Sequence, residues 1–188
     1  PPPMQIVGVM DGPLIGGVPK FVEIEILQDI PDLSIYGIGF ANNGGGTDGQ
    51  EFTFPMDAAI MGQRIFIASE ASGFMQFFSS AAPDYTSGSA SINGDDAIEL
   101  FCNGVVIDVF GDINVDGNGQ PWEYLDGWAS RTTDGPDGPT FQLMSWSFSG
   151  ANALDNETTN ETANPPYPSP PPMIMPCSGD AGPNILIN

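Results

Sequence analysis

The chain of 188 residues has no histidine and only three lysine and arginine residues, against 24 aspartates and glutamates. Without histidine, Ser/His/Asp and Cys/His catalytic sets and imidazole metal sites are excluded. At a formal net charge of −21, the surface has almost no cations to neutralise phosphates. We therefore expect no nucleic-acid partner and no attraction to anionic membranes, whereas cations should be drawn to the protein.

Long hydrophobic runs are missing as well. No apolar stretch approaches the length of a membrane span, so we expect no membrane insertion. The chain opens on Pro1-Pro2-Pro3 and shows no basic, apolar leader, which we interpret as a mature or processed chain. Together with the acidic composition, this favours an extracellular or cell-surface location.

What the sequence does contain indicates a turn-rich β protein. Hydrophobic residues make up 40% of the chain, and the 24 glycines and 19 prolines punctuate short apolar stretches. Such spacing favours a sandwich or barrel, and Asn103-Gly104 is typical of a two-residue hairpin turn. One short helix is predicted over 70–78, with Ser69 as its N-cap and three phenylalanines on one face. The predicted strands are 5–10, 21–27, 35–40, 51–54, 64–68, 98–101, 105–110, 140–143 and 145–148.

Proline divides the chain into a body and an arm. Residues 1–163 are predicted to form the folded body, and residues 164–188 a stiff, extended Pro-rich arm. The arm ends in the apolar stretch Asn184-Ile185-Leu186-Ile187-Asn188, which reads as a terminal strand. This strand either pairs within its own sheet or completes the sheet of a neighbouring copy.

Only two cysteines are present, Cys102 and Cys177. A single pair in an extracellular chain most often forms a disulfide, which here would tie the arm to the body. The alternative is two unrelated thiols.

The strongest motif is a calcium-type loop at 112–123, Asp-Ile-Asn-Val-Asp-Gly-Asn-Gly-Gln-Pro-Trp-Glu. Oxygen ligands alternate with spacers, Gly117 occupies the sharp turn, and a glutamate stands at the last position. The alternative is a solvated turn, because Gly119 and Pro121 depart from the EF-hand pattern and the preceding segment reads as a strand. The predicted Ca²⁺ ligands are Asp112, Asn114, Asp116, Asn118, Gln120 and Glu123.

Two N-glycosylation sequons, at Asn156 and Asn160, precede the arm. In a secreted eukaryotic chain they predict at least one N-glycan.

Catalytic patterns are weak. The nearest cluster of carboxylates for acid/base chemistry is Asp95, Asp96 and Glu99. A sugar-binding platform of Trp122, Tyr124 and Trp128 is an alternative to a structural role for these aromatics, which in β proteins usually belong to the core.

Several stretches of the body resemble the lamin tail domain, an immunoglobulin-like β-sandwich. The resemblance covers roughly residues 5–150, and its motifs are degenerate. It is carried by Asp32–Gly37, Phe52–Pro55, Gly62–Ile67, Asn93–Leu100, Gly104–Gly111, Trp128 and Arg131.

The resemblance implies a non-catalytic module of the kind found on secreted microbial proteins beside nucleases and other hydrolases. The 112–123 loop is an insertion relative to the simplest members.

These observations lead to one functional hypothesis and two alternatives. The hypothesis is a non-enzymatic extracellular structural subunit that assembles with copies of itself into filaments or a surface matrix, stabilised by Ca²⁺, a disulfide and N-glycans. The first alternative is a calcium-dependent carbohydrate-binding or adhesion module, which makes glycans possible partners. The second is an accessory domain of a secreted hydrolase, or a calcium-dependent hydrolase that uses the carboxylates at 95, 96 and 99.

Overall fold

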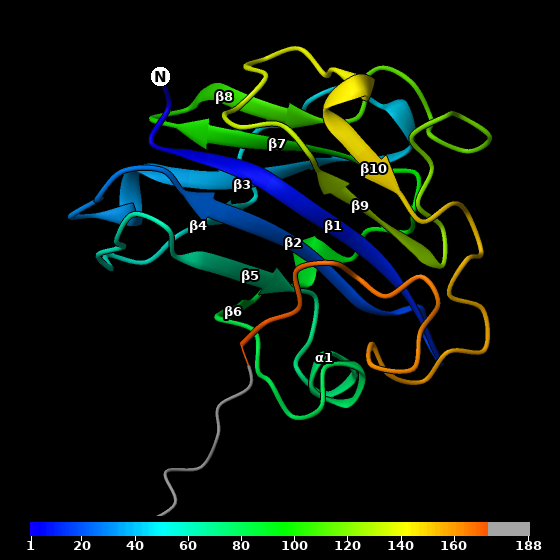
Figure 1. Cartoon of the computed structure of the whole chain (residues 1–188). Coiled ribbons are helices and arrows are strands. Elements are labelled where there is room, and N and C mark those ends of the chain that lie inside the picture. Colours follow the sequence, from blue (N-terminus) through cyan, green and yellow to red (C-terminus); the bar gives the residue numbers. More distant parts are fainter. Residues whose placement is uncertain (173–188) are drawn as a thin grey trace, which may run out of the picture.

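The computed structural model describes residues 1–172 as two β-sheets with one short helix (Figure 1). The larger sheet has six strands in the order β10-β9-β1-β2-β5-β6, and the smaller has four in the order β4-β3-β7-β8. Within the described residues the neighbouring strands are antiparallel, except that β5 and β6 are parallel. The strands of the larger sheet are β1 (Met4–Leu14), β2 (Val18–Ile26), β5 (Arg64–Ala68), β6 (Tyr85–Thr86), β9 (Gly127–Arg131) and β10 (Trp146–Phe148). Those of the smaller sheet are β3 (Tyr36–Ala41), β4 (Phe52–Thr53), β7 (Ala97–Cys102) and β8 (Val105–Phe110).

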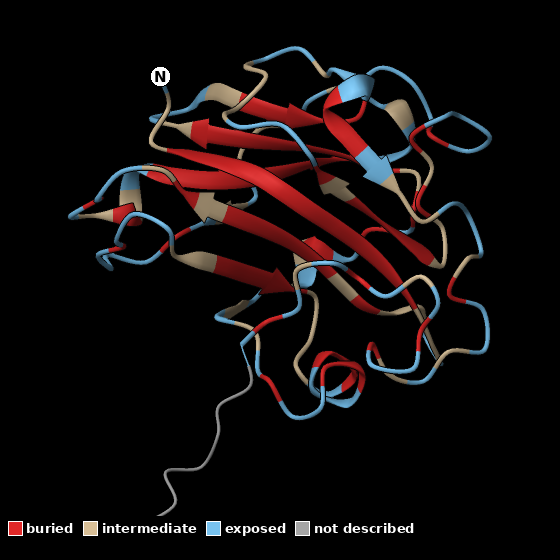
Figure 2. Cartoon of the chain, viewed as in Figure 1, coloured by how far each residue is buried: buried red, intermediate tan, exposed pale blue. Residues whose placement is uncertain are grey.

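The six-stranded sheet is covered on both faces. Its inner face packs on the four-stranded sheet through a core that includes Ile6, Val22, Ile38, Leu100 and Phe110. Its outer face carries a second apolar cluster, formed with α1 (Ser72–Phe77) and the segment from 150 onward. In Figure 1 the C-terminal segment, in orange, crosses in front of the sheet and α1 lies at the bottom of the view, and Figure 2 shows the central strands as mostly buried.

The all-β sandwich is confirmed, and most of the predicted strands are present with shifted ends. Asn103 and Gly104 both have positive φ, at 49° and 75°, as a two-residue hairpin turn between β7 and β8 requires. The strand predicted at 5–10 instead continues through Asp11-Gly12-Pro13, because a register shift against β2 accommodates those residues.

Several elements differ from the predicted ones. Residues 140–143 form no strand. The strand at Gly127–Arg131 is absent from the strands predicted by periodicity, because Gly127 and Arg131 interrupt its apolar pattern, although the lamin-tail resemblance placed Trp128 and Arg131 on a late strand. The helix begins later than predicted, with Ala71 instead of Ser69 before its first residue. Its first turn is closed by the Glu70 carboxylate, which accepts the backbone N–H of Gly73 at 2.9 Å.

Residues 1–172 also form four short 3₁₀ turns: Leu33–Ile35, Asn42–Gly44, Gly88–Ala90 and Leu143–Ser145.

The packed body extends beyond residue 163, where the sequence placed its boundary. Tyr167 is buried in the outer cluster against Phe21 and Trp128. The first part of the predicted arm is therefore part of the folded body. The terminal strand predicted at 184–188 falls outside the described residues.

Candidate functional site

The predicted calcium loop connects β8 to β9 and is closed by its own hydrogen bonds. Asp112 Oδ1 accepts the N–H of Asn114 at 3.0 Å, and Asp116 Oδ1 accepts that of Asn118 at 2.9 Å. Glu123 Oε2 accepts the N–H of Gly119 at 3.0 Å. The carboxylates that should face a common ion are thus used to fold the loop backbone.

The predicted ligands are divided between two pockets. Asp112 and Asn114 line one pocket, whereas Asn118 and Glu123 line another with Asp95. Within residues 1–172, no three or more acidic or cysteine side chains lie close enough together to hold a metal ion. The loop as folded offers no preformed calcium cage, and calcium binding stays a prediction of the sequence alone.

Removing calcium tests that prediction. A ligand that binds only the folded chain must raise its melting temperature, so a bound ion would make the protein less stable in chelator than in millimolar calcium. From the split of the ligands we expect a change of less than about 2 °C, measured by differential scanning calorimetry. A larger change that is lost in Glu123→Gln would show that the loop reorganises around an ion.

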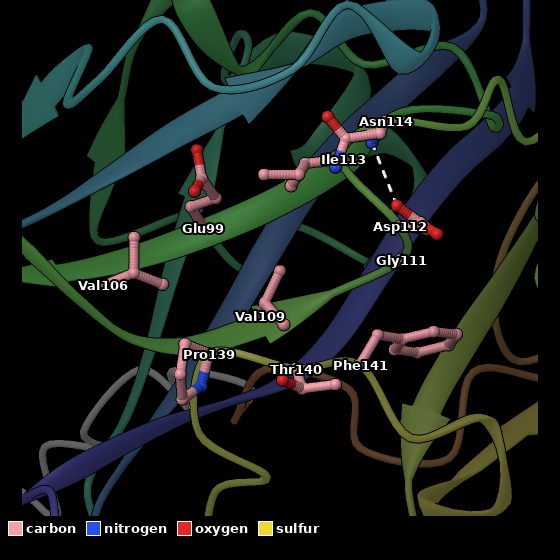
Figure 3. Close-up of a pocket in the computed structure, with 10 residues that line it drawn as sticks. All are labelled: Glu99, Val106, Val109, Gly111, Asp112, Ile113, Asn114, Pro139, Thr140 and Phe141. Atoms are coloured by element: carbon pink, nitrogen blue, oxygen red, sulfur yellow. Dashed lines mark hydrogen bonds between the residues drawn. The ribbon is translucent and has the colours of Figure 1, made fainter.

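The first pocket lies on the outer face of the four-stranded sheet and has a volume of about 390 Å³. Figure 3 shows Glu99 from β7 and the aliphatic Val106, Val109 and Ile113 around it, with Phe141 on one side. Glu99 is only 3% exposed. The lining is mainly apolar and carries two carboxylates, Glu99 and Asp112, so the hollow is suited to positioning a small group.

The second pocket, here called the acidic pocket, opens at the end of the sandwich where β1 and β2 turn. It is lined by Asp11, Lys20, Asn93, Asp95, Asn118, Glu123 and Asp126, among others. Burial raises the pKa of Asp95, and the charges of Asp96, Asp116 and Glu123 add to the effect. Asp95 Oδ1 is buried without a hydrogen-bond partner. The pocket therefore concentrates negative charge around a single lysine.

The three carboxylates considered for catalysis lie in three different environments. Asp95 faces the acidic pocket, and Glu99 faces the pocket on the outer sheet. Asp96 is buried, where its oxygens accept the backbone N–H groups of Asn43 and Asn93 at 2.9 and 3.1 Å. They do not surround one cleft, so the geometry gives no support to a hydrolase that uses them as a set.

The predicted aromatic platform is not formed. Trp122, Tyr124 and Trp128 are 5%, 0% and 6% exposed. Trp122 packs edge-on against Phe110, and the Tyr124 hydroxyl donates to the carbonyl of Asp96 at 2.9 Å. These side chains belong to the core, because strand β9 and the loop before it turn them inward.

The two sequons differ in their surroundings. Asn156 is exposed, whereas Asn160 is buried and its amide is engaged with the backbone of Tyr167. Asn160 Nδ2 donates to Tyr167 O at 3.3 Å, and its Oδ1 accepts the Tyr167 N–H at 2.7 Å. In the folded chain, Asn156 is the sequon whose side chain is open to solvent.

Of the predicted disulfide, only one half can be located. Cys102 ends β7 beside the hairpin turn and is partly buried. Cys177 lies outside the described residues.

A buried ion cluster that the sequence did not suggest joins the two sheets. Arg131 on β9 donates to both oxygens of Asp108 on β8, at 3.0 and 2.8 Å, and both side chains are 0% exposed. Arg131 also donates to Asp137 at 2.8 Å and to the Ile6 carbonyl at 2.7 Å, with Trp146 stacked 4.7 Å from its guanidinium. The available sequence signal for this cluster was Arg131 itself, because it is one of only three cationic residues and follows Trp128, Ala129 and Ser130, which carry no charge.

A second buried carboxylate anchors the C-terminal segment. Glu23, at 0% exposure, accepts hydrogen bonds from the Tyr167 hydroxyl, from Arg64 at 2.8 Å and from Ser169 at 3.0 Å. Burial raises the pKa of Glu23, against the opposing effect of these donors. Gly8 makes room for the tyrosine, because a Cβ at that position would overlap its hydroxyl.

These buried carboxylates make stability depend on pH. Burial raises the pKa of Asp108 from 3.8 to about 6, although Arg131 opposes the shift. Asp108 therefore binds its proton more tightly in the folded chain than in the unfolded chain. Its contribution to the free energy of unfolding is complete below pH 4 and is lost as the pH rises through 6. We expect the free energy of unfolding to be about 1 to 1.5 kcal/mol higher at pH 5 than at pH 8 from this group.

Denaturant unfolding at a series of pH values measures this effect. Asp108→Asn removes the titrating group and should flatten the profile between pH 4 and pH 7, whatever its effect on absolute stability. An unchanged slope in that variant would assign the pH dependence to other carboxylates.

Comparisons with known proteins add no relative: no protein-family model, no curated protein and no solved structure matches the chain. The class that the fold defines is an all-β two-sheet sandwich with a helix and a C-terminal segment on one face. Within residues 1–172, no helix has the length and apolar character needed to cross a bilayer.

Proposed function

We propose that this chain is an extracellular structural subunit without enzymatic activity, which joins copies of itself through the residues that follow Pro172. The observation that carries the proposal is the anchored C-terminal segment. Tyr167 is fixed by Glu23 at its hydroxyl and by Asn160 at its backbone, deep in the outer apolar cluster. The residues beyond Pro172 therefore start from a defined point on the body, as an arm that connects rigid subunits must.

The end of that arm has the composition of a donated strand. Residues 184–188 do not alternate between polar and apolar residues, and most of them are β-branched or aliphatic, which suits pairing with an open sheet edge. The body presents such edges at β10 and β6 in one sheet and at β4 and β8 in the other. Strand addition from one copy to the next would generate a chain of subunits, because donor and acceptor lie on different parts of the molecule.

The immunoglobulin-like, lamin-tail type of the sandwich is part of this proposal. The stretches with the strongest resemblance, Asn93–Leu100 and Gly104–Gly111, pair as the β7–β8 hairpin. Trp128 and Arg131 lie together on β9. These placements are compatible with a non-catalytic module, and the separated carboxylates at 95, 96 and 99 agree with that role.

Calcium at 112–123, the Cys102–Cys177 disulfide and a glycan at Asn156 would stiffen or protect such a subunit. Each is supported by sequence pattern alone, and assembly as proposed requires none of them. The carbohydrate-binding alternative loses its main structural support, because its aromatic residues are buried.

The arm is tested by comparing the full chain with a chain that ends at Pro172, which keeps the Tyr167 anchor. We expect the full chain to form multimers or filaments, and the shortened chain to be monomeric with the same melting temperature. Light scattering after size exclusion and electron microscopy measure the outcome. A matched variant with serine at Ile185, Leu186 and Ile187 keeps the length of the arm and should also be monomeric.

Two results would contradict the proposal. One is a shortened chain that still assembles. The other is a full chain that stays monomeric at every concentration; binding of that monomer to a glycan array would then favour the carbohydrate-binding alternative.

A further inference from the structure

The only lysine of the chain faces a buried aspartate across the β1–β2 pair. Asp11 and Lys20 are register partners, and Lys20 Nζ lies 2.5 Å from Asp11 Oδ1. Their side chains are 13% exposed for Lys20 and 3% for Asp11. Val9 and Val22 on the same strands belong to the core between the sheets, so the alternation of side chains places this pair on the inner side as well.

Groups beside the neighbouring strand β9 and from the opposite sheet close around the pair. The backbone N–H of Asp126 points to Asp11 Oδ2 at 3.5 Å. Asp96, which precedes β7 in the other sheet, is near enough for the charge of Lys20 to act on its pKa, as is Asp126. The fully buried Tyr124 donates its hydroxyl to the Asp96 carbonyl. A lysine and a carboxyl group thus meet at the end of the core, beside further carboxyl groups.

We propose that Lys20 and Asp11 condense into an intramolecular isopeptide bond between Nζ and Cγ. The ammonium and the carboxylate together give one amide and one water, so the net charge of the pair is unchanged. A proton first passes from Nζ to the carboxylate. The neutral amine then attacks Cγ, and the C–O bond of the tetrahedral intermediate breaks as a second Nζ proton leaves with the hydroxyl. No oxidant, metal or further reactant is needed.

The surroundings favour each step. Burial raises the pKa of Asp11 to about 6, which makes it a better acceptor for the lysine proton than an exposed carboxylate. Fixing the two groups in contact replaces a bimolecular encounter by a first-order reaction, with effective concentrations of about 10⁵ M or more in favourable cases. The Asp126 N–H faces the oxygen on which negative charge develops, and the carboxyl groups of Asp96 and Asp126 can relay protons.

The bond would clamp the β1–β2 hairpin beside its turn at Gly16 and Gly17. That hairpin forms the centre of the six-stranded sheet. A covalent link at its tip would prevent the two strands from separating from that end. This inference does not depend on the proposed assembly, and its test is independent of the oligomeric state.

Intact-mass spectrometry of the reduced full chain, produced in a bacterial host that adds no N-glycans, tests the proposal. We expect a mass about 18 Da below that of the sequence, since one water is lost. Trypsin should fail to cut after Lys20. A second protease that cuts between the linked residues, such as chymotrypsin after Leu14, should then leave the segments around residues 11 and 20 joined as a branched peptide.

Two variants separate this bond from other dehydrations. Asp11→Asn should still form the bond, with a loss of about 17 Da as ammonia leaves instead of water, and with protection from trypsin after Lys20, which a succinimide at position 11 would not give. Lys20→Arg should keep the full mass. A loss of water that persists in Lys20→Arg would identify a succinimide at Asp11-Gly12 and overturn the proposal. So would an unmodified wild-type mass with normal tryptic cleavage after Lys20.

Discussion

Asp108→Ala is expected to lower the free energy of unfolding by about 3 to 5 kcal/mol, a large part of the stability of a domain this size. The substitution leaves the Arg131 guanidinium at 0% exposure without its main counter-ion. It also removes the acceptor for two backbone N–H groups, of Ile6 at 2.9 Å and of Asp137 at 3.1 Å. Breaking one side of a buried pair costs more than the pair itself contributes, because the remaining charge stays desolvated.

A half-exposed ion pair provides the control. Arg64 and Glu25 approach to 3.5 Å with side chains 36% and 25% exposed, so Glu25→Gln should cost less than about 1 kcal/mol. Urea unfolding followed by fluorescence measures both variants. Equal, small losses would mean that the Arg131 cluster is hydrated in solution and does not join the sheets as described.

Tyr167→Ala is expected to lower the free energy of unfolding by about 3 to 5 kcal/mol, as much as Asp108→Ala. The ring is 1% exposed and packs edge-on against Phe21, Phe78 and Trp128. Its loss leaves a cavity in the outer cluster, and Glu23 loses one of its donors while it remains buried. The substitution should also release the C-terminal segment from the sheet, because this side chain holds it there.

Limited proteolysis separates the two consequences. In Tyr167→Ala, cleavage after residue 160 should become faster than global unfolding allows. Tyr167→Phe keeps the ring but lacks the hydroxyl, so it should lose only about 1 to 3 kcal/mol and keep the segment protected. If Tyr167→Ala is as stable and as protected as wild type, the segment is not anchored through this residue, and the proposed root of the arm is wrong.

Local patterns in the sequence were sufficient for elements that depend on neighbouring residues. The Asn103-Gly104 turn was predictable because positive φ at both positions favours these residue types. The buried face of α1 followed from the spacing of Phe74, Phe77 and Phe78, all of which are core residues. Periodicity did not predict strand β9, which only the family resemblance indicated, because Arg131 interrupts its pattern and is buried as the partner of Asp108 on another strand.

The candidate calcium loop shows even more clearly that a local sequence pattern does not predict side-chain contacts. The spacing of Asp112, Asp116 and Glu123 matches a calcium loop, but spacing cannot decide where the carboxylates point. In the folded chain each accepts a backbone N–H of its own loop. For Trp122 and Tyr124 the sequence favoured the core but left a sugar-binding platform open, and contact with Phe110 decided for the core.

The sequence by itself determined the class of fold, the acidic surface and the absence of histidine chemistry, because composition and short-range periodicity are properties of the chain alone. The tertiary structure decided which charges are buried together: Arg131 with Asp108, Glu23 with Tyr167, and Lys20 with Asp11. Arg131 with Asp108 and Glu23 with Tyr167 join residues distant in the sequence, and Lys20 with Asp11 depends on the register of a bulged strand pair. Such contacts are set by the packing of the two sheets, which no local pattern encodes.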